Sequence, residues 1–436
     1  MSIDCVILAG GLGSRMNSST LKFFQTIADK PLIEYVADAC KEIAANSIIT
    51  VVSKRFKDYG FPLDTKTVVQ NRPSGTANAV LQAMPLLNSE YTIVMYGDAF
   101  LAERSCLKEL AEAPGDAVFI ATELPNNLSC MPYGRVITDG DKFQKIVEFK
   151  DATDTEKQCN LVNSGIYKFK TSILKKFIDN VQKNNAAKEY YLTDILEILK
   201  TNGFEVSALK SQEYRLFHGI NTMQDLAVAE EIMQTKLREK FMKSGVKLLA
   251  PESVYFSFDT EIENDVVIEQ NVVIKGKVKI KSGAKIKAFS YIENCEIMEN
   301  TSIGPFARLR NDTKLLENSC VGNFVEVKGS VVGSNSKIKH LSYIGDATIG
   351  NNSNVGAGTV ICNYDGVRKH KTHIGDEAFI GSNSTLISPI TINKGAIIAA
   401  GSVIDKDVPP DSLAISRSEQ KNILGKAAQI WERKRK

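Results

Sequence analysis

The sequence lacks long apolar runs, paired cysteine motifs and an excess of either charge, and each absence excludes a class of protein. No apolar stretch approaches the roughly 20 residues that cross a bilayer, so we expect no association with a membrane. The N-terminal segment carries an acid at position 4 and an apolar run of only Cys5 to Ala9, which argues against secretion. The eight cysteines include no C-x-x-C pair, which excludes a zinc ribbon or a disulfide framework and favours a reducing, cytoplasmic compartment. With 54 basic against 51 acidic residues, the chain offers no polyanion-binding surface, so nucleic acid is not an expected partner.

The chain of 436 residues exceeds what one hydrophobic core organises, and its two halves follow different rhythms. In the first half, short apolar runs alternate with amphipathic stretches, which predicts a doubly wound α/β domain with a mostly parallel sheet. The expected strands are Cys5–Ala9, Ser47–Val52, Tyr91–Met95 and Ala117–Thr122, and the expected helices are Leu32–Ala45, Ala77–Leu87 and Ser105–Glu112. We expect this domain at residues 1–222, a linker helix at 223–244 and a second domain with a C-terminal tail at 245–436.

Aliphatic residues recur every six positions in the second half, in series that slip by one residue or pause between runs. The positions are Ile262, Ile268, Ile274, Ile280, Ile286, Ile292, Ile297, Ile303, Leu309, Leu315, Val321, Val327, Val332, Ile338, Ile344, Ile349, Val355, Ile361, Ile374, Ile380, Leu386, Ile392, Ile398 and Ile404. A period of six matches neither a helix nor a single alternating strand, but it fits a solenoid of short strands and corners. Gly276, Asn300, Gly333, Gly350 and Asn352 lie near the expected corners, where tight bends are needed. Three faces would close a coil of about 18 residues, so we expect a parallel β-helix of about eight coils.

The glycine-rich segment LAGGLGSRM follows the first expected strand, where backbone N–H groups can approach phosphate and Arg15 adds a fork of donors. A structural tight turn would also explain this loop, and a dinucleotide fingerprint is disfavoured because Met16 replaces the third glycine. Together with Lys22, the segment resembles the L-x-x-G-x-G-T-R-M…P-K signature of sugar-phosphate nucleotidylyltransferases, with Leu21 in place of the proline. Further motifs follow in that family's order: Gln70…Gly75-Thr76, Tyr96-Gly97-Asp98, Tyr133-Gly134-Arg135, residues 147–152, Asn163-Ser164-Gly165, residues 189–194 and Gly219-Ile220-Asn221.

The resemblance implies a Rossmann-like nucleotidyltransferase domain and assigns roles to these residues. The expected site for UTP and the UDP-sugar contains Leu8, Ala9, Gly10, Gly11, Lys22, Gln70, Gly75, Thr76, Tyr96, Gly97, Asp98, Gly134, Glu148, Asn163 and Asn221. Within it, Gly10 and Gly11 contact the triphosphate with the catalytic cations Arg15 and Lys22, and the loop of Gln70, Gly75 and Thr76 faces uracil. Gly134, Glu148 and Asn163 bind the acetylated sugar, and Asp98 with Asn221 holds Mg²⁺. Because G-T-A also occurs in relatives that use other nucleotides, a nucleotide other than UTP remains an alternative.

Histidines are few, with His218 in the first half and His340, His370 and His373 in the second. Acyl transfer from a thioester to an amine needs a base near neutrality, and histidine has the right ordinary pKa. His370 lies within the basic run 368–371 and His373 follows it, and we expect this segment to be a solvated loop. His340 alone would be read as a surface residue, but the motifs around it favour a catalytic role.

Those motifs, from Thr301 to Arg417, include TSIGPFARLR, VGNFVEVK, NVGAGT and NYDG. They resemble the acetyltransferase half of the bifunctional N-acetylglucosamine-1-phosphate uridyltransferase/glucosamine-1-phosphate acetyltransferase family. The resemblance implies a left-handed parallel β-helix of hexapeptide repeats, a homotrimer whose acetylation sites lie between neighbouring subunits, and acetyl-CoA as co-substrate. It makes His340 the general base, oriented by Glu326. It assigns the amino-sugar phosphate to Arg310, Lys328, Tyr343 and Asn354, and acetyl-CoA to Ala357, Asn363, Tyr364, Ser382, Ala400 and Arg417.

We therefore expect an enzyme that acetylates glucosamine 1-phosphate and then joins the product to UTP, supplying UDP-N-acetylglucosamine for peptidoglycan and lipopolysaccharide. One alternative is a nucleotidylyltransferase whose β-helix only oligomerises or regulates, which would not need His340, Tyr364 or Arg417. Another is a binding scaffold with a decayed catalytic half, against which the presence of Arg15 and Asp98 argues. The basic C-terminal end either covers the acetyl-CoA phosphates or is a solvated tail.

Overall fold

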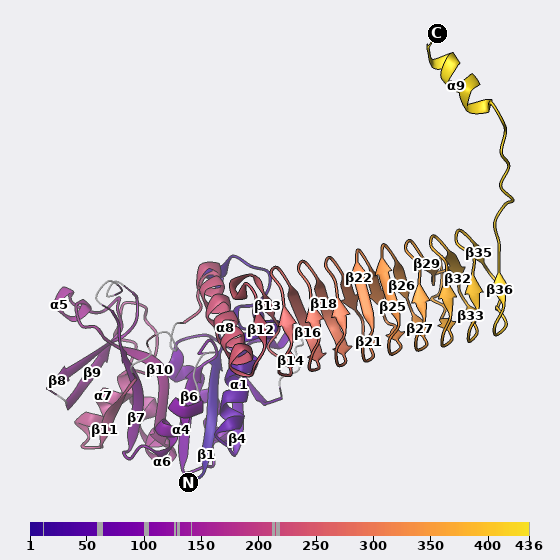
Figure 1. Cartoon of the computed structure of the whole chain (residues 1–436). Helices are drawn as coiled ribbons and strands as arrows, with labels where there is room; N and C mark the ends of the chain where they lie inside the picture. The colour runs from indigo at the N-terminus through magenta and orange to yellow at the C-terminus, as the bar shows by residue number, and fades with distance from the viewer. Residues whose placement is uncertain are drawn as a thin grey trace. The chain divides into compact units, whose positions relative to one another are not determined.

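The computed structural model forms two compact units, Met1–Ile232 and Met233–Lys436, which divide within helix α8 (Met223–Lys243) (Figure 1). It describes residues 1–11, 13–58, 64–99, 104–125, 128, 131–140, 142–211, 214 and 219–435. Across these residues, every helix is too short or too polar to cross a bilayer.

The N-terminal unit is built on a nine-stranded sheet. Its main path runs β11 (Val206–Ser211), β7 (Ala117–Glu123), β10 (Leu161–Lys170), β6 (Tyr91–Tyr96), β1 (Ile3–Ala9), β4 (Ser47–Ser53) and β5 (Lys66–Gln70), and the hairpin β8 (Arg135–Asp139) and β9 (Lys142–Val147) joins at β10. A separate two-stranded sheet pairs β2 (Thr26–Ile27) with β3 (Lys30–Pro31). The expected parallel order holds for β5, β4, β1 and β6, whereas β10 is antiparallel to both its neighbours. The chain reaches β10 from the β8–β9 hairpin and a single helical turn, so no long crossover imposes a parallel direction.

Helices cover both faces of this sheet. They are α1 (Leu32–Glu42), α2 (Lys54–Asp58), α3 (Thr76–Ala83), α4 (Arg104–Glu112), α6 (Thr171–Phe177) and α7 (Asp194–Thr201), whereas the single turn α5 (Asp154–Lys157) buries no residue. In β1, Val6 and Leu8 belong to one hydrophobic cluster and Cys5 and Ile7 to the other, because successive side chains of a strand point to opposite faces. The doubly wound α/β expectation is thereby confirmed.

The C-terminal unit is a parallel β-helix with three faces, which we call A, B and C in chain order (Figure 1). Face A contains β12 (Lys247–Leu248), β15 (Val267–Ile268), β17 (Lys285–Ile286), β19 (Ser302–Ile303), β22 (Cys320–Asn323), β25 (Lys337–His340), β28 (Asn354–Val355), β31 (Phe379–Ile380), β34 (Ile397–Ile398) and β36 (Leu413–Ala414). Face B contains β20 (Arg308–Arg310), β23 (Glu326–Lys328), β26 (Tyr343–Gly345), β29 (Val360–Cys362), β32 (Thr385–Ile387) and β35 (Val403–Ile404). Face C contains β21 (Thr313–Leu315), β24 (Val331–Val332), β27 (Ala347–Ile349), β30 (Thr372–Ile374) and β33 (Ile390–Ile392). In the first coils, β13 (Tyr255–Phe256) and β14 (Glu261–Ile262) pair with the long β16 (Val273–Ile280), and β18 (Tyr291–Ile297) joins faces B and C.

The six-residue series lies inside the β-helix. All its members are buried except Ile262, which is half-buried. Among the residues that the structure describes, strand β14, which carries Ile262, pairs with β16 alone, so no earlier coil covers it there. Gly333 and Gly350 serve close stacking of successive coils, since a Cβ on Gly333 would lie 2.4 Å from the backbone of Gly350.

The second half of α8 packs on the first coil of the β-helix. Gln234, with 1% of its surface exposed, exchanges two hydrogen bonds with the backbone of Phe256, at 2.7 and 2.9 Å. Arg238 donates to the carbonyl oxygens of Val254 and Glu252. At the other end, residues 417–435, including helix α9 (Lys426–Arg435), are exposed.

Candidate active sites

In the N-terminal unit, the glycine-rich loop and Asp98 meet where parallel strands β1 and β6 end. The backbone N–H of Gly97 donates to the carbonyl of Leu8 at 3.0 Å, which joins the two strand ends. Strand β1 lies between β4 and β6, so later strands of the chain are added to the sheet on both sides of β1. In open α/β sheets this switch in strand order leaves a crevice at the carboxyl ends, where ligands bind.

Four predicted phosphate and metal residues converge in this crevice. Lys22 Nζ lies 2.6 Å from Asp98 Oδ2 and 3.1 Å from Asn221 Oδ1, and Arg15 Nη2 donates to the same Asn221 oxygen at 2.9 Å. The side chains of Lys22 and Asp98 are 10% and 12% exposed, so this ion pair is largely shielded from water. Two cations close to one carboxylate suit a polyphosphate.

The expected metal fits the donor set of this cluster. Mg²⁺ prefers oxygen ligands and usually takes only one or two protein groups together with phosphate and water. Asp98 and Asn221 supply a carboxylate and an amide oxygen, and the ammonium of Lys22 lies within hydrogen-bond reach of both. A single cation can therefore contact both oxygens, as a metal ion would have to.

The predicted base-binding loop lies next to the glycine-rich loop. Gln70, almost fully buried at the end of β5, donates from Nε2 to Gly75 O at 3.2 Å and to Asn78 Oδ1 at 2.9 Å. A Cβ on Gly10 would lie 2.6 Å from Gln70 Oε1, so the two loops touch. Gly75 has φ +116° and no room for a side chain, because a Cβ would lie 2.3 Å from Tyr190 O. Asn78 had no predicted role, although it lies two residues after Thr76 in the first turn of helix α3.

The predicted sugar residues also come together. Asn163 N donates to Gly134 O at 2.9 Å, and a Cβ on Gly134 would lie 3.5 Å from both carboxylate oxygens of Glu148. Burial raises the pKa of Glu148, although the hydroxyl of Thr193, which donates to Glu148 Oε1 at 3.2 Å, acts in the opposite direction. These groups can hydrogen-bond the hydroxyls and the amide of a sugar.

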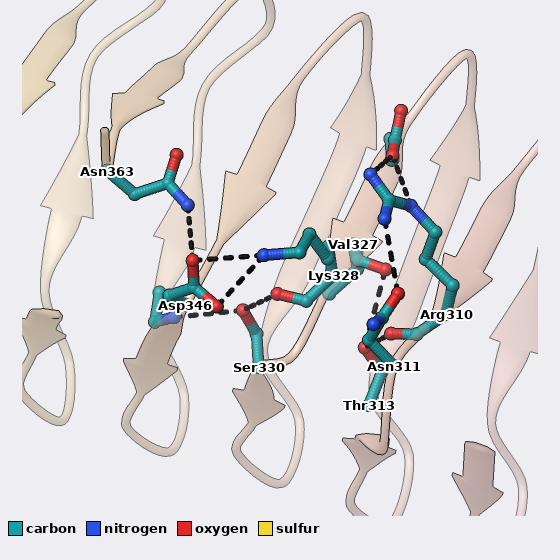
Figure 2. Close-up of polar contacts among 10 residues, drawn as sticks. Arg310, Asn311, Thr313, Val327, Lys328, Ser330, Asp346 and Asn363 are labelled. Atoms are coloured by element: carbon teal, nitrogen blue, oxygen red, sulfur yellow. Dashed lines mark hydrogen bonds and ion pairs between the residues drawn. The ribbon is translucent and has the colours of Figure 1, made fainter. Parts of the chain in front are cut away.

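In the C-terminal unit, a charged cluster lies along face B and its corner with face C (Figure 2). Lys328 Nζ contacts both oxygens of Asp346 at 3.1 Å, and Asn363 Nδ2 donates to Asp346 from the next coil. Arg310 donates from Nε to Glu326 Oε1 at 2.7 Å. A Cβ on Gly345 would lie 2.6 Å from the hydroxyl of Tyr343 and 2.8 Å from Asn363 Nδ2. The structure thus joins Asn363, predicted for acetyl-CoA, to the predicted phosphate residues.

Lys369 belongs to the same cluster but is absent from the predicted site. Lys369 lies within hydrogen-bonding range of Lys328, and this contact together with the positive charge of Lys328 lowers the pKa of Lys369. The charge of Arg310 lowers that pKa further, and the charge of Asp346 raises it. Lys369 lies in the basic run expected to be a solvated loop. Only the fold shows that this loop returns to the corner that carries Asp346.

His340 has a different partner from the one expected. Its Nδ1 lies 2.7 Å from Asn323 Oδ1, on the preceding coil of face A, whereas Glu326 pairs with Arg310. Within this chain the partner at His340 Nδ1 is therefore Asn323, and the role of Glu326 in orienting His340 stays a prediction. Because an amide oxygen only accepts hydrogen bonds, Nδ1 carries the proton and Nε2 of the neutral ring is free to take one.

Four of the predicted acetyl-CoA residues lie in one row with His340. The row follows the corner between faces A and B, which we call corner AB, where each coil donates a backbone hydrogen bond to the coil before it. The carbonyls of His340, Ala357 and Ser382 accept from Gly358, Asn383 and Gly401, and Ala400 O accepts from the side chain of Arg417 at 2.9 Å. The row could follow an extended ligand.

Two other predicted residues lie elsewhere. Asn354 is level with Lys337 at the start of face A, away from the His340 end of that face. The hydroxyl of Tyr364, in the insertion, donates to Gly366 O at 2.6 Å. His370 contacts Asp365 at 2.7 Å, His373 is exposed on β30, and His218 lies outside the described residues.

Comparison with known proteins agrees with this division. Residues 5–134 match the MobA-like NTP transferase domain, and residues 259–294 and 371–406 match the bacterial transferase hexapeptide family. The bifunctional protein GlmU of Zymomonas mobilis is 41% identical over 445 residues, which cover 99% of this chain and 98% of that protein. The chain belongs to the GlmU family. GlmU proteins of Rhizobium rhizogenes and Thermodesulfovibrio yellowstonii are 42% and 39% identical, covering 98% and 100% of this chain and 96% and 100% of theirs.

Membership in the GlmU family confirms the family expected from the motifs. The chain is a bifunctional transferase, with a nucleotidyltransferase unit followed by a hexapeptide-repeat unit. The alternatives with one active half do not fit this membership.

Proposed function

We propose that this chain makes UDP-N-acetylglucosamine in two steps. It first transfers an acetyl group from acetyl-CoA to glucosamine 1-phosphate, and then joins the product to UTP with Mg²⁺, releasing pyrophosphate. The observation that carries the proposal is the presence of two separate clusters in one chain. In one unit Lys22 contacts Asp98, and both Lys22 and Arg15 contact Asn221. The other unit carries the exposed, oriented His340 and the Lys328 cluster.

In the nucleotidyl step, a phosphate oxygen of the sugar attacks the α-phosphorus of UTP, and the bond from that phosphorus to pyrophosphate breaks. The attacking oxygen is already ionised, so the chain needs no general base. Arg15 and Lys22 bind the triphosphate and offset charge on the leaving group, while Gln70 and Thr76 hold the base. Asp98 and Asn221 would hold Mg²⁺, which supplies further charge stabilisation when bound.

In the acetyl step, the sugar amine attacks the thioester carbonyl, the C–N bond forms, and the C–S bond breaks to release the thiol of CoA. His340 takes a proton from the amine through Nε2 and passes it to the departing thiolate, while Asn323 holds the ring at Nδ1. Arg310, Lys328 and Lys369 bind the sugar phosphate. Ala357, Ser382, Ala400 and Arg417 lie where CoA can extend along corner AB.

The acetylation site is completed by a second copy of this chain, within a homotrimer. In one chain, His340, Lys328 and Asn354 lie at three different corners of the β-helix, although the resemblance assigns all three to the acetylation site. Corner AB also carries an exposed aromatic ridge, Phe289, Phe306 and Phe324, whose rings stack at 4.9 and 5.1 Å and are 45–55% exposed. Such a ridge beside His340 suits burial against a neighbouring subunit.

The test supplies purified protein with Mg²⁺, glucosamine 1-phosphate, acetyl-CoA and UTP, and follows free thiol and pyrophosphate separately. His340→Ala should lower thiol release by at least about a hundredfold, as expected for a lost general base. Pyrophosphate should then form only when N-acetylglucosamine 1-phosphate is added. His373→Ala, which removes an exposed histidine of the same β-helix, is the matched control and should release thiol normally. If the wild-type protein releases no thiol, the acetyl step is refuted and the β-helix is a scaffold.

A further inference from the structure

Tyr167 lies behind the proposed sugar site in the N-terminal unit and has no assigned role. It stands on β10, four residues after Asn163, and is fully buried. Its hydroxyl accepts a hydrogen bond of 2.6 Å from Asn163 Nδ2. Its ring stacks on Phe169 and meets Tyr96 edge-on, with centroids 6.0 and 6.5 Å apart. The ring therefore has fixed neighbours, and only the hydroxyl reaches the site.

Tyr96 lies near both Tyr167 and the base-binding residue Thr76. The side chains of Tyr167 and Thr76 act to lower the pKa of the Tyr96 phenol, against the larger effect of burial. Thr76 Oγ1 accepts from the backbone N–H of Leu192 at 2.8 Å. Burial raises the pKa of both phenols, so both keep their protons and can donate. The Tyr167 hydroxyl that contacts Asn163 therefore remains a neutral phenol.

The backbone of Gly165 and the hydroxyl of Tyr167 together fix the Asn163 amide. The backbone N–H of Gly165 donates to Asn163 Oδ1 at 3.2 Å, while Nδ2 donates to Tyr167. A flipped amide would set Nδ2 against the N–H of Gly165, donor against donor, whereas the Tyr167 hydroxyl can donate or accept and would bond either amide atom. The Gly165 N–H therefore decides which way the amide faces, and the Tyr167 hydroxyl holds it there. In the observed orientation, one N–H and one lone pair of Asn163 remain for a ligand.

We infer that Tyr167 is a positioning residue that holds Asn163 in the orientation needed to bind the N-acetylhexosamine phosphate. The inference rests on the proposed function, because the role of Asn163 is itself proposed. Tyr167 does not touch the substrate.

The experiment measures pyrophosphate formation from UTP and N-acetylglucosamine 1-phosphate with full-length Tyr167→Phe, which keeps the ring and removes the hydroxyl. We expect the KM for the sugar phosphate to rise about three- to tenfold, as for one lost hydrogen bond. The KM for UTP and kcat should change less than about twofold, since the cation cluster at Asp98 is untouched. The thiol released by the acetyl step reports that the remainder of the chain is intact.

Tyr35→Phe is the matched control. Its hydroxyl donates to the carbonyl of Ile27 at 2.8 Å, in the same unit and outside the site, so the variant loses one similar bond. It should leave the KM for the sugar phosphate unchanged. If Tyr167→Phe behaves like Tyr35→Phe, Tyr167 has only a structural role and the inference is overturned.

Asn163→Ala, alone and combined with Tyr167→Phe, distinguishes a failure of this inference from a failure of the proposed function on which it rests. If Asn163→Ala raises the KM for the sugar phosphate and the second change adds nothing, Tyr167 acts through Asn163. If the two effects multiply, the inference fails and the proposed site stands. If Asn163→Ala leaves that KM unchanged, the proposed sugar site and the inference both fail.

Discussion

Asp194 carries a partly buried carboxyl in the first turn of α7, next to Thr193, which donates a hydrogen bond to Glu148. Burial, followed by the charges of Glu197 and Asp151, raises the pKa of Asp194 to about 6. Its pKa in the unfolded chain is near 3.9, so the folded protein binds a proton more readily between these values. The stability that Asp194 contributes is therefore present at pH 4 and lost as the pH rises through 6.

Asp194→Asn should remove this loss. We expect the free energy of unfolding of the variant, relative to that of the native chain, to increase by about 1 kcal/mol between pH 4.5 and 7.5, after a discount for partial exposure. Urea unfolding at the two pH values, followed by helical circular dichroism, measures the difference. A difference that is the same at both pH values would contradict the assigned cause.

Individual side-chain partners were the hardest feature to predict from the sequence. The motifs indicate His340 and Lys328, and the structure gives both charged or polar partners. Asn323 and Lys369 could not be identified as partners, because each depends on which residue of a neighbouring coil or insertion lies opposite. The series of coils slips by one residue at several points, so that register follows from the fold and not from spacing.

Helix α8 covers the first coil of the β-helix and supplies hydrogen bonds that an earlier coil would otherwise make. Gln234 satisfies both the N–H and the carbonyl of Phe256 from within the helix. Gln234→Ala would leave two buried backbone groups unpaired, which costs about 3 kcal/mol. Hydrogen exchange should become faster in residues 247–262 and remain unchanged in residues 379–404.

The exposed Gln420 provides the matched control for this element. Its Nε2 donates to Asn422 in the C-terminal tail, so Gln420→Ala should leave exchange in both segments as it is in the native chain. Equal exchange in residues 247–262 of the Gln234→Ala and Gln420→Ala variants would show that α8 does not stabilise the first coil.

Among the helices and strands, those with a strongly periodic sequence were predicted more completely than those that depend on residue propensity. The six-residue series located the inward face of nearly every coil, because each aliphatic residue must fill the same narrow interior. In the N-terminal unit, the buried parallel strands β1, β4 and β6 were predictable from apolar runs. Strand β10 was missed because its ten residues include Asn163, Ser164 and Gly165, whose polarity and small size conceal a strand. The motif that weakens the strand pattern is the one that serves the proposed sugar site.

For the whole molecule, the proposal of a shared acetylation site predicts complementation between inactive chains. His340→Ala and Lys328→Ala should each lose acetyl transfer when expressed alone. Co-expressed in equal amounts, they should recover about one quarter of native activity, because a neighbouring pair then supplies one intact His340 and one intact Lys328 with that probability. The thiol released from acetyl-CoA measures the recovery.

A second mixture controls for subunit exchange. His340→Ala co-expressed with the His340→Ala/Lys328→Ala double variant has no chain with an intact His340 and should stay inactive. Both mixtures should form pyrophosphate normally from N-acetylglucosamine 1-phosphate. Absence of recovery in the first mixture would place the complete site within one chain.

The coils of the β-helix pair in strict succession, Arg308 with Glu326, Glu326 with Tyr343 and Tyr343 with Val360. A growing polypeptide can therefore add each coil to the one already formed as it leaves the ribosome, with no need to wait for distant segments. His340 is in place well before Arg417 has been synthesised. The row on corner AB is thus completed last at its C-terminal end, and a prematurely terminated chain would carry the base without the full surface proposed for its acetyl donor.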